Sequence, residues 1–149
     1  MGARPGPPIE RDFRNALERG EVGLLSVVDQ LLGPKPSLKI GATTITAYRG
    51  VHEVLASTLD LAARAAADEK SWNATYNKLA VELSRAKIVV NYQLVRGQIS
   101  RDIATLLNDV LNAIDSAMRN KQRDQVRERA ERGRVLIDAL TVLIYRAKK

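Results

Sequence analysis

With 149 residues the chain has room for one compact domain, and it carries no cysteine, which excludes disulfides, thiol catalysis and thiolate metal sites. Its 24 Lys and Arg residues outnumber its 17 Asp and Glu residues, and the net charge of +7 favours a nucleic acid or another anionic surface as partner. No apolar run approaches the roughly 20 residues that span a bilayer, and the N-terminus lacks a secretory signal pattern, so we expect a cytoplasmic protein that does not enter a membrane.

Residues 1–42 predict a flexible leader followed by short accessory helices. The first residues, MGARPGPP, are rich in proline and glycine, which disfavours regular structure. A short amphipathic helix follows, and Gly33 and Pro34 end it. Its apolar line consists of Val22, Leu25, Val28 and Leu32. We interpret residues 33–42 as a linker to a helical bundle domain over residues 43–149.

Four long helices are predicted in this second domain. Hydroxyl side chains stand at the expected helix starts, where they accept hydrogen bonds from the free amides of a first turn, and Gly97 provides a C-terminal stop. We expect helices from Thr43 and Thr44 to about Asp68, from Ser71 to about Arg96, from Ser100 with Asp102 onward, and from about Arg123. No repeat and no strand pattern is present. The predicted fold class is therefore all-α, a small helical bundle of about four to six helices.

Apolar residues recur at intervals of three and four along these helices and predict the core. The expected inward lines are Ile45, Tyr48, Leu55, Leu59, Ala62 and Ala66; Ile103, Leu107, Val110, Ile114 and Ala117; and Val126, Ala130, Gly133, Ile137, Leu140, Ile144 and Ala147. The helix over 72–96 differs, because it has two apolar lines on nearly opposite faces. One holds Trp72, Tyr76, Leu79, Leu83, Ala86, Val90 and Leu94, and the other holds Ala74, Val81, Ile88 and Val95. We expect this helix to be central and covered on two sides.

A third line along the same helix is basic and aromatic. It consists of Lys78, Arg85, Tyr92 and Arg96, at intervals of seven, seven and four. A guanidinium group can donate two parallel hydrogen bonds to the oxygens of one phosphate, and a tyrosine ring can stack on a base or a ribose. This line is therefore a candidate RNA-binding surface. The alternative is a solvated edge on which Glu82 pairs with its neighbours.

The densest basic run leads into the last predicted helix. It contains Arg119, Lys121, Arg123, Arg127, Arg129, Arg132 and Arg134, interrupted only by Asp124, Glu128 and Glu131. As a surface it supplies salt-dependent phosphate contacts without sequence readout. The alternative is a solvated helix start, although the helix dipole favours acidic residues there.

Residues for catalysis or metal binding are scarce. His52 is the only histidine, and Asp102, Asp109 and Asp115 fall where a polar helix face is expected. No glycine-rich loop joins a strand to a helix, so no phosphate cradle of that kind is present. We expect a protein that is not an enzyme and that has no metal and no cofactor.

Several motifs resemble those of one protein family, the small helical subunits of type III-A CRISPR effector (Csm) complexes. Thr44 and Arg49 are similar to the threonine-capped first helix with its early arginine. The segment from Lys87 through Tyr92 and Gln93 to Arg96 is similar to the family's basic and tyrosine-containing helix, and Asp138-Ala-Leu is similar to its closing helix. The resemblance covers residues 43–149.

This resemblance implies a non-catalytic subunit that stacks in several copies along a ribonucleoprotein complex, contacts other effector subunits, and braces guide RNA and the target RNA paired with it. It points to Arg49, Lys87, Tyr92 and Arg96. On a helical wheel, however, Lys87 lies about 180° from Arg96, so the two cannot follow one phosphate track. The candidate RNA-binding residues are Arg49, Lys78, Arg85, Lys87, Tyr92, Arg96, Lys121, Arg123, Arg127 and Arg134. The alternative is a helical protein-interaction or adaptor module, or a small subunit of a related type III complex, with little direct RNA contact.

Overall fold

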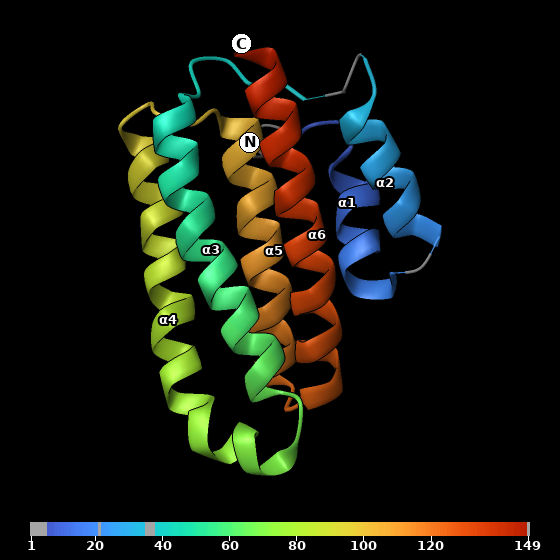
Figure 1. The fold of residues 1–149 in the computed structure, drawn as a ribbon, viewed down its shortest axis with the longest axis vertical. Helices are drawn as coiled ribbons and strands as arrows, with labels where there is room; N and C mark the ends of the chain where they lie inside the picture. The colour runs from blue at the N-terminus through green and yellow to red at the C-terminus, as the bar shows by residue number, and fades with distance from the viewer. Residues whose placement is uncertain (1–5, 21, 35–37, 149) are drawn as a thin grey trace, which may run out of the picture.

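The computed structural model describes residues 6–20, 22–34 and 38–148, and these residues form helices without any strand (Figure 1). The helices are α1 (Glu10–Arg19), α2 (Val22–Leu32), α3 (Ile45–Ala65), α4 (Glu69–Val95), α5 (Arg101–Arg119) and α6 (Arg123–Ala147). The predicted all-α class is confirmed. Among the described helices, none combines the length and the apolar character that a membrane crossing requires.

The four long helices form an antiparallel bundle, and the two short helices lie against one side of it (Figure 1). Around the bundle, α3 packs against α4, α4 against α5, α5 against α6, and α6 against α3. The α1–α2 pair is in contact with α6, and α1 also reaches α5. Short connections between successive long helices favour this up-and-down order.

Side-chain and glycine caps set the ends of the long helices. Thr44 and Ser100 are N-caps as predicted, and their hydroxyls accept hydrogen bonds from amides in the first turn at 3.1 and 3.2 Å. The start of α4 corrects the prediction: Asp68 is the cap, and the Ser71 amide donates to Asp68 Oδ1 at 2.7 Å. A carboxylate is favoured over a hydroxyl there because it also meets the positive end of the helix dipole. Gly97, with φ of +72°, ends α4 as expected.

The predicted core lines of α3, α5 and α6 are buried. The exceptions lie at helix ends, where Ile45 is half-buried and Ala147 is exposed in the last turn. Tyr48 is the largest buried side chain, and its hydroxyl donates to the Ile137 carbonyl at 2.8 Å, which satisfies its one donor. Burial raises the pKa of Tyr48 above its ordinary value.

The N-terminal helices belong to the same core. Ile9, Phe13 and Leu17 are buried with residues of α5 and α6 in one cluster, which therefore spans both sides of residue 42. The predicted apolar line of α2 is wrong in part: Leu25 is 68% exposed and Leu32 is also exposed. The helix instead buries Val27 and Leu31, because its contacts are with α1 and α6 and those contacts choose the face. Residues 1–5 of the predicted leader lie outside the described residues.

The segment before α3 is tied to the start of α5. The Lys39 amide donates to Asp102 Oδ2 at 2.8 Å, and the Ser100 hydroxyl donates to the Lys39 carbonyl at 2.7 Å. The Ser100 amide donates to the buried Thr43 hydroxyl at 2.7 Å. Residues 38–42 thus form no helix and are held to the start of α5, and residues 35–37 of the predicted linker lie outside the described part of the chain.

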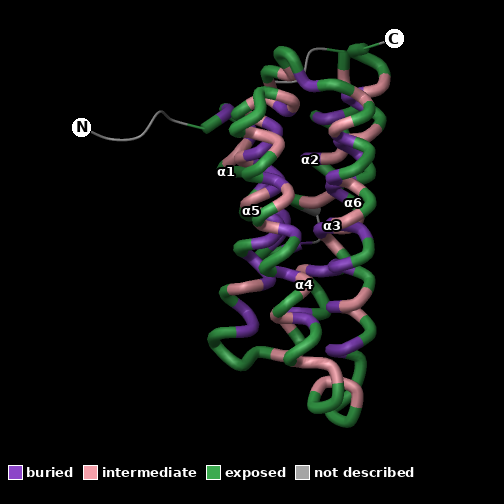
Figure 2. The backbone as a smooth tube through the Cα atoms, turned by 90° about the vertical axis from the view of Figure 1, so that its left-hand side faces the viewer, coloured by how far each residue is buried: buried purple, intermediate pink, exposed green. Residues whose placement is uncertain are grey.

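The position of α4 corrects a second prediction. This helix is not central; it lies at the edge of the bundle, with α3 and α5 as its packing neighbours (Figures 1 and 2). Its first apolar line is inside, with Leu79, Leu83, Ala86 and Val90 buried. The second line is uncovered, and Val81, Ile88 and Val95 are 49%, 67% and 85% exposed. In a bundle whose four helices form a ring, no helix is central. The helix with the most packing neighbours is α6, because the α1–α2 pair packs on it in addition to α3 and α5.

Candidate nucleic-acid interface

The predicted basic line of α4 lies together on the outer face of that helix. Lys78, Arg85, Tyr92 and Arg96 are all exposed. From first to last they span about 27 Å along the helix axis. The inner line of α4 is held by α3 and α5, and this packing directs the whole basic line outward.

Few carboxylates neutralise this line. Arg85 is 70% exposed, and its nearest carboxylate oxygen, Glu82 Oε1, is 3.9 Å from Nη1. Lys78 forms no ion pair with any residue of the described ranges. The guanidinium carbon of Arg96 lies 5.4 Å from the centroid of the Tyr92 ring, a cation–π contact that pairs a stacking ring with a phosphate-binding group. The outer face is therefore free to bind an anion.

Lys87 is directed away from this line, as the helical wheel predicts. Its Nζ pairs with Asp115 Oδ2 on α5, while Arg119 Nε donates to Asp115 Oδ1. Burial disfavours ionisation of Asp115, but the hydrogen bonds from the two cations outweigh it and lower the pKa of Asp115. The structure thus gives Lys87 an internal partner that joins α4 to α5.

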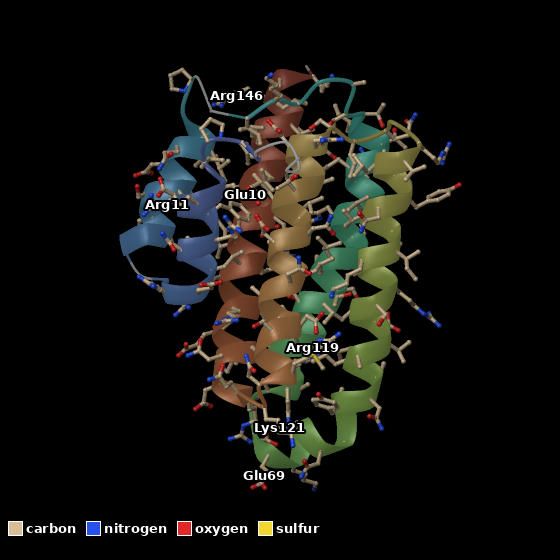
Figure 3. The ribbon with its side chains drawn as sticks, turned by 180° about the vertical axis from the view of Figure 1, so that it is seen from behind. Glu10, Arg11, Glu69, Arg119, Lys121 and Arg146 are labelled. Atoms are coloured by element: carbon tan, nitrogen blue, oxygen red, sulfur yellow. The ribbon has the colours of Figure 1, made fainter. Side chains whose placement is uncertain are left out.

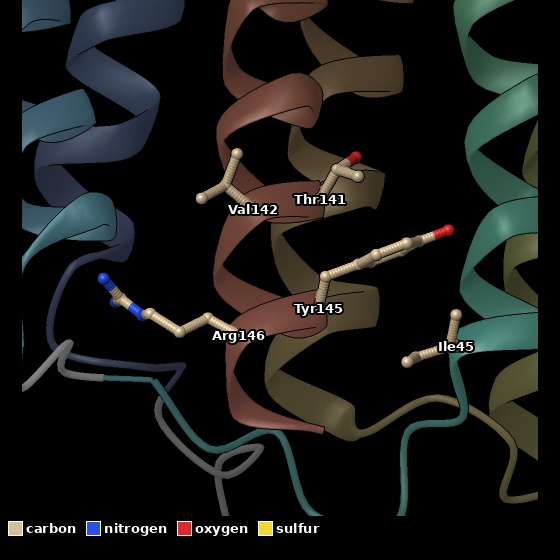
Figure 4. Close-up of a pocket in the computed structure, with 5 residues that line it drawn as sticks. All are labelled: Ile45, Thr141, Val142, Tyr145 and Arg146. Carbon is tan, nitrogen blue, oxygen red and sulfur yellow. The ribbon is translucent and has the colours of Figure 1, made fainter. Parts of the chain in front are cut away.

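Arg49 lies on a third side of the molecule. Its Nε donates to the Tyr145 hydroxyl at 3.2 Å, so it joins the start of α3 to the end of α6. This hydrogen bond raises the pKa of Arg49. Tyr145 also lines an apolar hollow of about 510 Å³ with Ile45, Thr141, Val142 and Arg146 (Figure 4). Arg49 and the basic line of α4 do not form one surface.

The basic run before and within α6 is dispersed by the fold. Arg127 pairs with Glu131 at 3.3 Å on the same helix, and Arg134 Nε lies 3.3 Å from Asp60 Oδ1 on α3. Arg134 also binds Asp138, which accepts from His52 Nε2 at 2.8 Å. Several of these arginines hold helices together, and they do not constitute a single anion-binding surface.

Two arginines of the run bind backbone carbonyl groups, a use that the sequence did not indicate. Arg129 Nη1 donates to the Ala113 carbonyl of α5 at 2.8 Å, and Arg132 Nη1 donates to the Leu17 carbonyl of α1 at 3.2 Å. The acceptors lie far away in sequence, and periodicity carries no information about them. Only the packing of α6 against α1 and α5 creates these contacts.

Lys121 and Arg123 remain at the turn between α5 and α6. This turn lies at the end of the bundle where α4 begins (Figure 3). Lys121 has φ of +55°, the left-handed conformation that ends α5, and its side chain is exposed. Arg123 is half-buried near Asp68: the hydrogen bond from Ser71 lowers the pKa of Asp68, and the Arg123 cation adds to this effect. Within the described chain, these two cations and Arg129 are the members of the run that form no ion pair, and of the three only Arg129 donates to a backbone carbonyl.

Metal ligands do not gather anywhere in residues 6–20, 22–34 and 38–148: no group of three His, Asp or Glu side chains is placed to hold an ion. Comparison of the chain with protein-family models, with curated proteins and with solved structures finds no match.

Proposed function

We propose that this chain is a non-catalytic RNA-binding subunit that acts in the cytoplasm within a type III-A CRISPR effector complex, where it braces guide RNA and its paired target RNA. The observation that carries the proposal is the outer face of α4, where exposed Lys78, Arg85 and Arg96 lie with Tyr92 in one line. The link to this particular complex comes from the resemblance of residues 43–149 to its small subunits.

Phosphate contacts explain the line better than ordinary surface charge does. Salt bridges at exposed sites contribute little to stability, and of the three cations only Arg85 has a carboxylate within 4 Å, so ion pairing within the chain does not account for this line. The chemistry that fits is a polyanion along the helix, with the Tyr92 ring stacked on a base or sugar beside Arg96. Such contacts bind the phosphate backbone of the RNA and do not distinguish its base sequence.

A salt titration of RNA binding by the full chain tests this proposal. Arg85→Ala with Arg96→Ala is expected to lower affinity about tenfold or more and to reduce the slope of log K against log salt by about two, one for each phosphate contact. Arg11→Ala with Arg64→Ala removes the same charge from exposed positions of α1 and α3 and is the matched control. Equal losses in both double variants would assign binding to net charge and contradict the α4 line.

The second candidate is a helical protein-interaction module. The uncovered apolar line of Val81, Ile88 and Val95 on α4 favours it, because exposed apolar residues at helical spacing are typical of a docking surface. Binding of that kind depends little on salt. An RNA affinity that is weak at low salt and has a flat salt slope would favour this second function.

A further inference from the structure

The hollow at the end of α6 lies apart from the basic line of α4 and has an apolar lining. Its volume is about 510 Å³, and Ile45 of α3 lines it with Thr141, Val142, Tyr145 and Arg146 of α6 (Figure 4). Val142 is 50% exposed, so this apolar lining is in contact with solvent. The volume is within the range of small-molecule sites in proteins.

Two polar side chains of the lining are bound to other partners. The Thr141 hydroxyl donates to the Ile137 carbonyl of its own helix at 3.0 Å. Arg146 points away from the hollow in Figure 4, and its Nη1 and Nη2 donate to the carbonyls of Leu32 and Gly33 at 2.7 and 2.6 Å. Arg146 therefore contributes its aliphatic stem to the lining, and this side of the hollow is apolar.

Unused hydrogen-bond donors lie at the edge of the hollow where α3 and α6 meet. Arg49 follows Ile45 by one turn of α3, and its Nε donates to the Tyr145 hydroxyl at 3.2 Å. Within the described chain, the Nη atoms of Arg49 form no hydrogen bond and no ion pair, and the proton of the Tyr145 hydroxyl has no acceptor. A guanidinium group and a hydroxyl with spare donors thus adjoin one apolar hollow.

The charge at this edge is positive. No carboxylate lines the hollow, and Glu53, one turn further along α3, acts on Arg49 only through its electrostatic field. Asp138 of α6 accepts from His52 and Arg134. The start of α3 and the end of α6 both lie at this end of the molecule, where their dipoles oppose each other (Figure 1). Arg49 therefore sets the sign of the charge that the hollow accommodates.

We propose that the hollow binds a small amphipathic carboxylate, with its apolar body against Val142 and the Tyr145 ring and its carboxylate on Arg49. Burial of the apolar body supplies binding free energy. The guanidinium group donates two parallel hydrogen bonds to one carboxylate, and the Tyr145 hydroxyl donates a third. The inference goes beyond the proposed function and holds whether or not the chain binds RNA.

A titration of the full chain with sodium octanoate below its micellar concentration tests this site by NMR of the backbone amides. Saturable shifts are expected around Ile45, Arg49, Val142 and Tyr145. The neutral analogue 1-octanol is expected to bind at least about fivefold more weakly, because it lacks the charge-assisted hydrogen bonds. Octylammonium has the wrong charge and inorganic phosphate has no apolar body, so neither is expected to shift these amides.

Two pairs of matched variants separate the contributions of body and charge. Val142→Asp places a like charge in the lining and is expected to lower octanoate affinity about tenfold or more. Val135→Asp adds the same charge at an exposed position two turns earlier on α6 and is expected to leave affinity unchanged. Arg49→Gln is expected to abolish the preference for octanoate over 1-octanol, whereas Arg64→Gln, at an exposed position of α3, is expected to preserve it.

Several results would overturn the site. They are equal affinities for octanoate and octylammonium, shifts confined to α4 around Val81 and Ile88, equal losses in Val142→Asp and Val135→Asp, or no saturable shift at millimolar octanoate. Circular dichroism checks the fold of each variant. If Val142→Asp does not fold, Val142→Trp replaces it, because the larger side chain fills the hollow and is also expected to prevent binding.

Discussion

At the residue scale, Asp109 is the most unusual ionisable group of the described chain. It lies half-buried on α5 where α1 packs, beside a pocket of about 240 Å³ that Arg14 and Glu18 also line. Burial and the neighbouring Glu10 carboxyl raise the pKa of Asp109 to about 8, and Oδ2 has no hydrogen-bond partner among the described residues. The carboxyl therefore keeps its proton in the folded state at neutral pH.

The shift makes stability depend on pH. Between about pH 4 and pH 8 the folded state holds a proton on Asp109 that the unfolded chain has lost, so stability falls as pH rises through this window and levels off above it. Asp109→Asn is expected to remove this slope and to raise the free energy of unfolding at pH 8 by about 1 kcal/mol, a value discounted for partial solvent access.

Urea unfolding at pH 5 and pH 8 measures this effect. Asp29→Asn, at an exposed carboxylate on α2, is the matched control and is expected to leave the slope unchanged. Parallel pH profiles for the wild type and Asp109→Asn would show that Asp109 does not cause the dependence.

At the element scale, the close approach of α6 to its neighbours depends on Gly133. A Cβ atom at this position would lie 2.8 Å from Val110 Cγ1 on α5 and 3.5 Å from Leu59 Cδ1 on α3. Val110 is fully buried, and a β-branched side chain has little freedom to move away. The glycine therefore sets the distance at which three helices meet.

Gly133→Ala is expected to lower the free energy of unfolding by about 1–3 kcal/mol, because overpacking outweighs the higher helix propensity of alanine. Gly50→Ala on α3 is the control. A Cβ there meets nothing within 4 Å, so that variant is expected to gain up to about 1 kcal/mol. Thermal unfolding of both variants measures whether stability falls at Gly133 and rises at Gly50. A gain in stability at both positions would show that close packing does not require glycine at position 133.

At the scale of the whole molecule, the α1–α2 pair completes the core. Phe13 and Leu17 of α1 are buried with residues of α5 and α6, and Arg146 of α6 donates to the carbonyls of Leu32 and Gly33 at the end of α2 at 2.7 and 2.6 Å. One apolar cluster joins the pair to the bundle. The described chain is thus expected to unfold as one unit.

Phe13→Ala is expected to lower the stability of the entire molecule by about 3–5 kcal/mol, in a single transition. Leu25→Ala, at an exposed position of α2, is the control and is expected to change stability little. Urea unfolding followed by circular dichroism measures both. A separate early transition that leaves the bundle intact would instead assign α1 and α2 to an independent unit.

Local patterns were sufficient to predict much of this fold. The three-four spacing of apolar residues identified the four long helices and their buried lines, because each line is a property of one helix. The caps at Thr44 and Ser100 and the stop at Gly97 also followed from local chemistry. The outward position of Lys78, Arg85, Tyr92 and Arg96 was predicted in the same way.

Only the tertiary structure decided which faces are covered and which cations are free. Periodicity shows that Val81, Ile88 and Val95 share a face, but it does not say whether a neighbouring helix exists for that face. Arg132 binds a carbonyl of α1, and Arg134 binds a carboxylate of α3, so the basic run in the sequence is not a basic surface in space. The sequence by itself determined the helices and the apolar and basic lines along each of them, because these depend on neighbours along the chain. It also determined the net charge, which is a property of composition alone. The packing of distant segments determined that the second apolar line of α4 is uncovered and which cations are free, because those depend on neighbours in space.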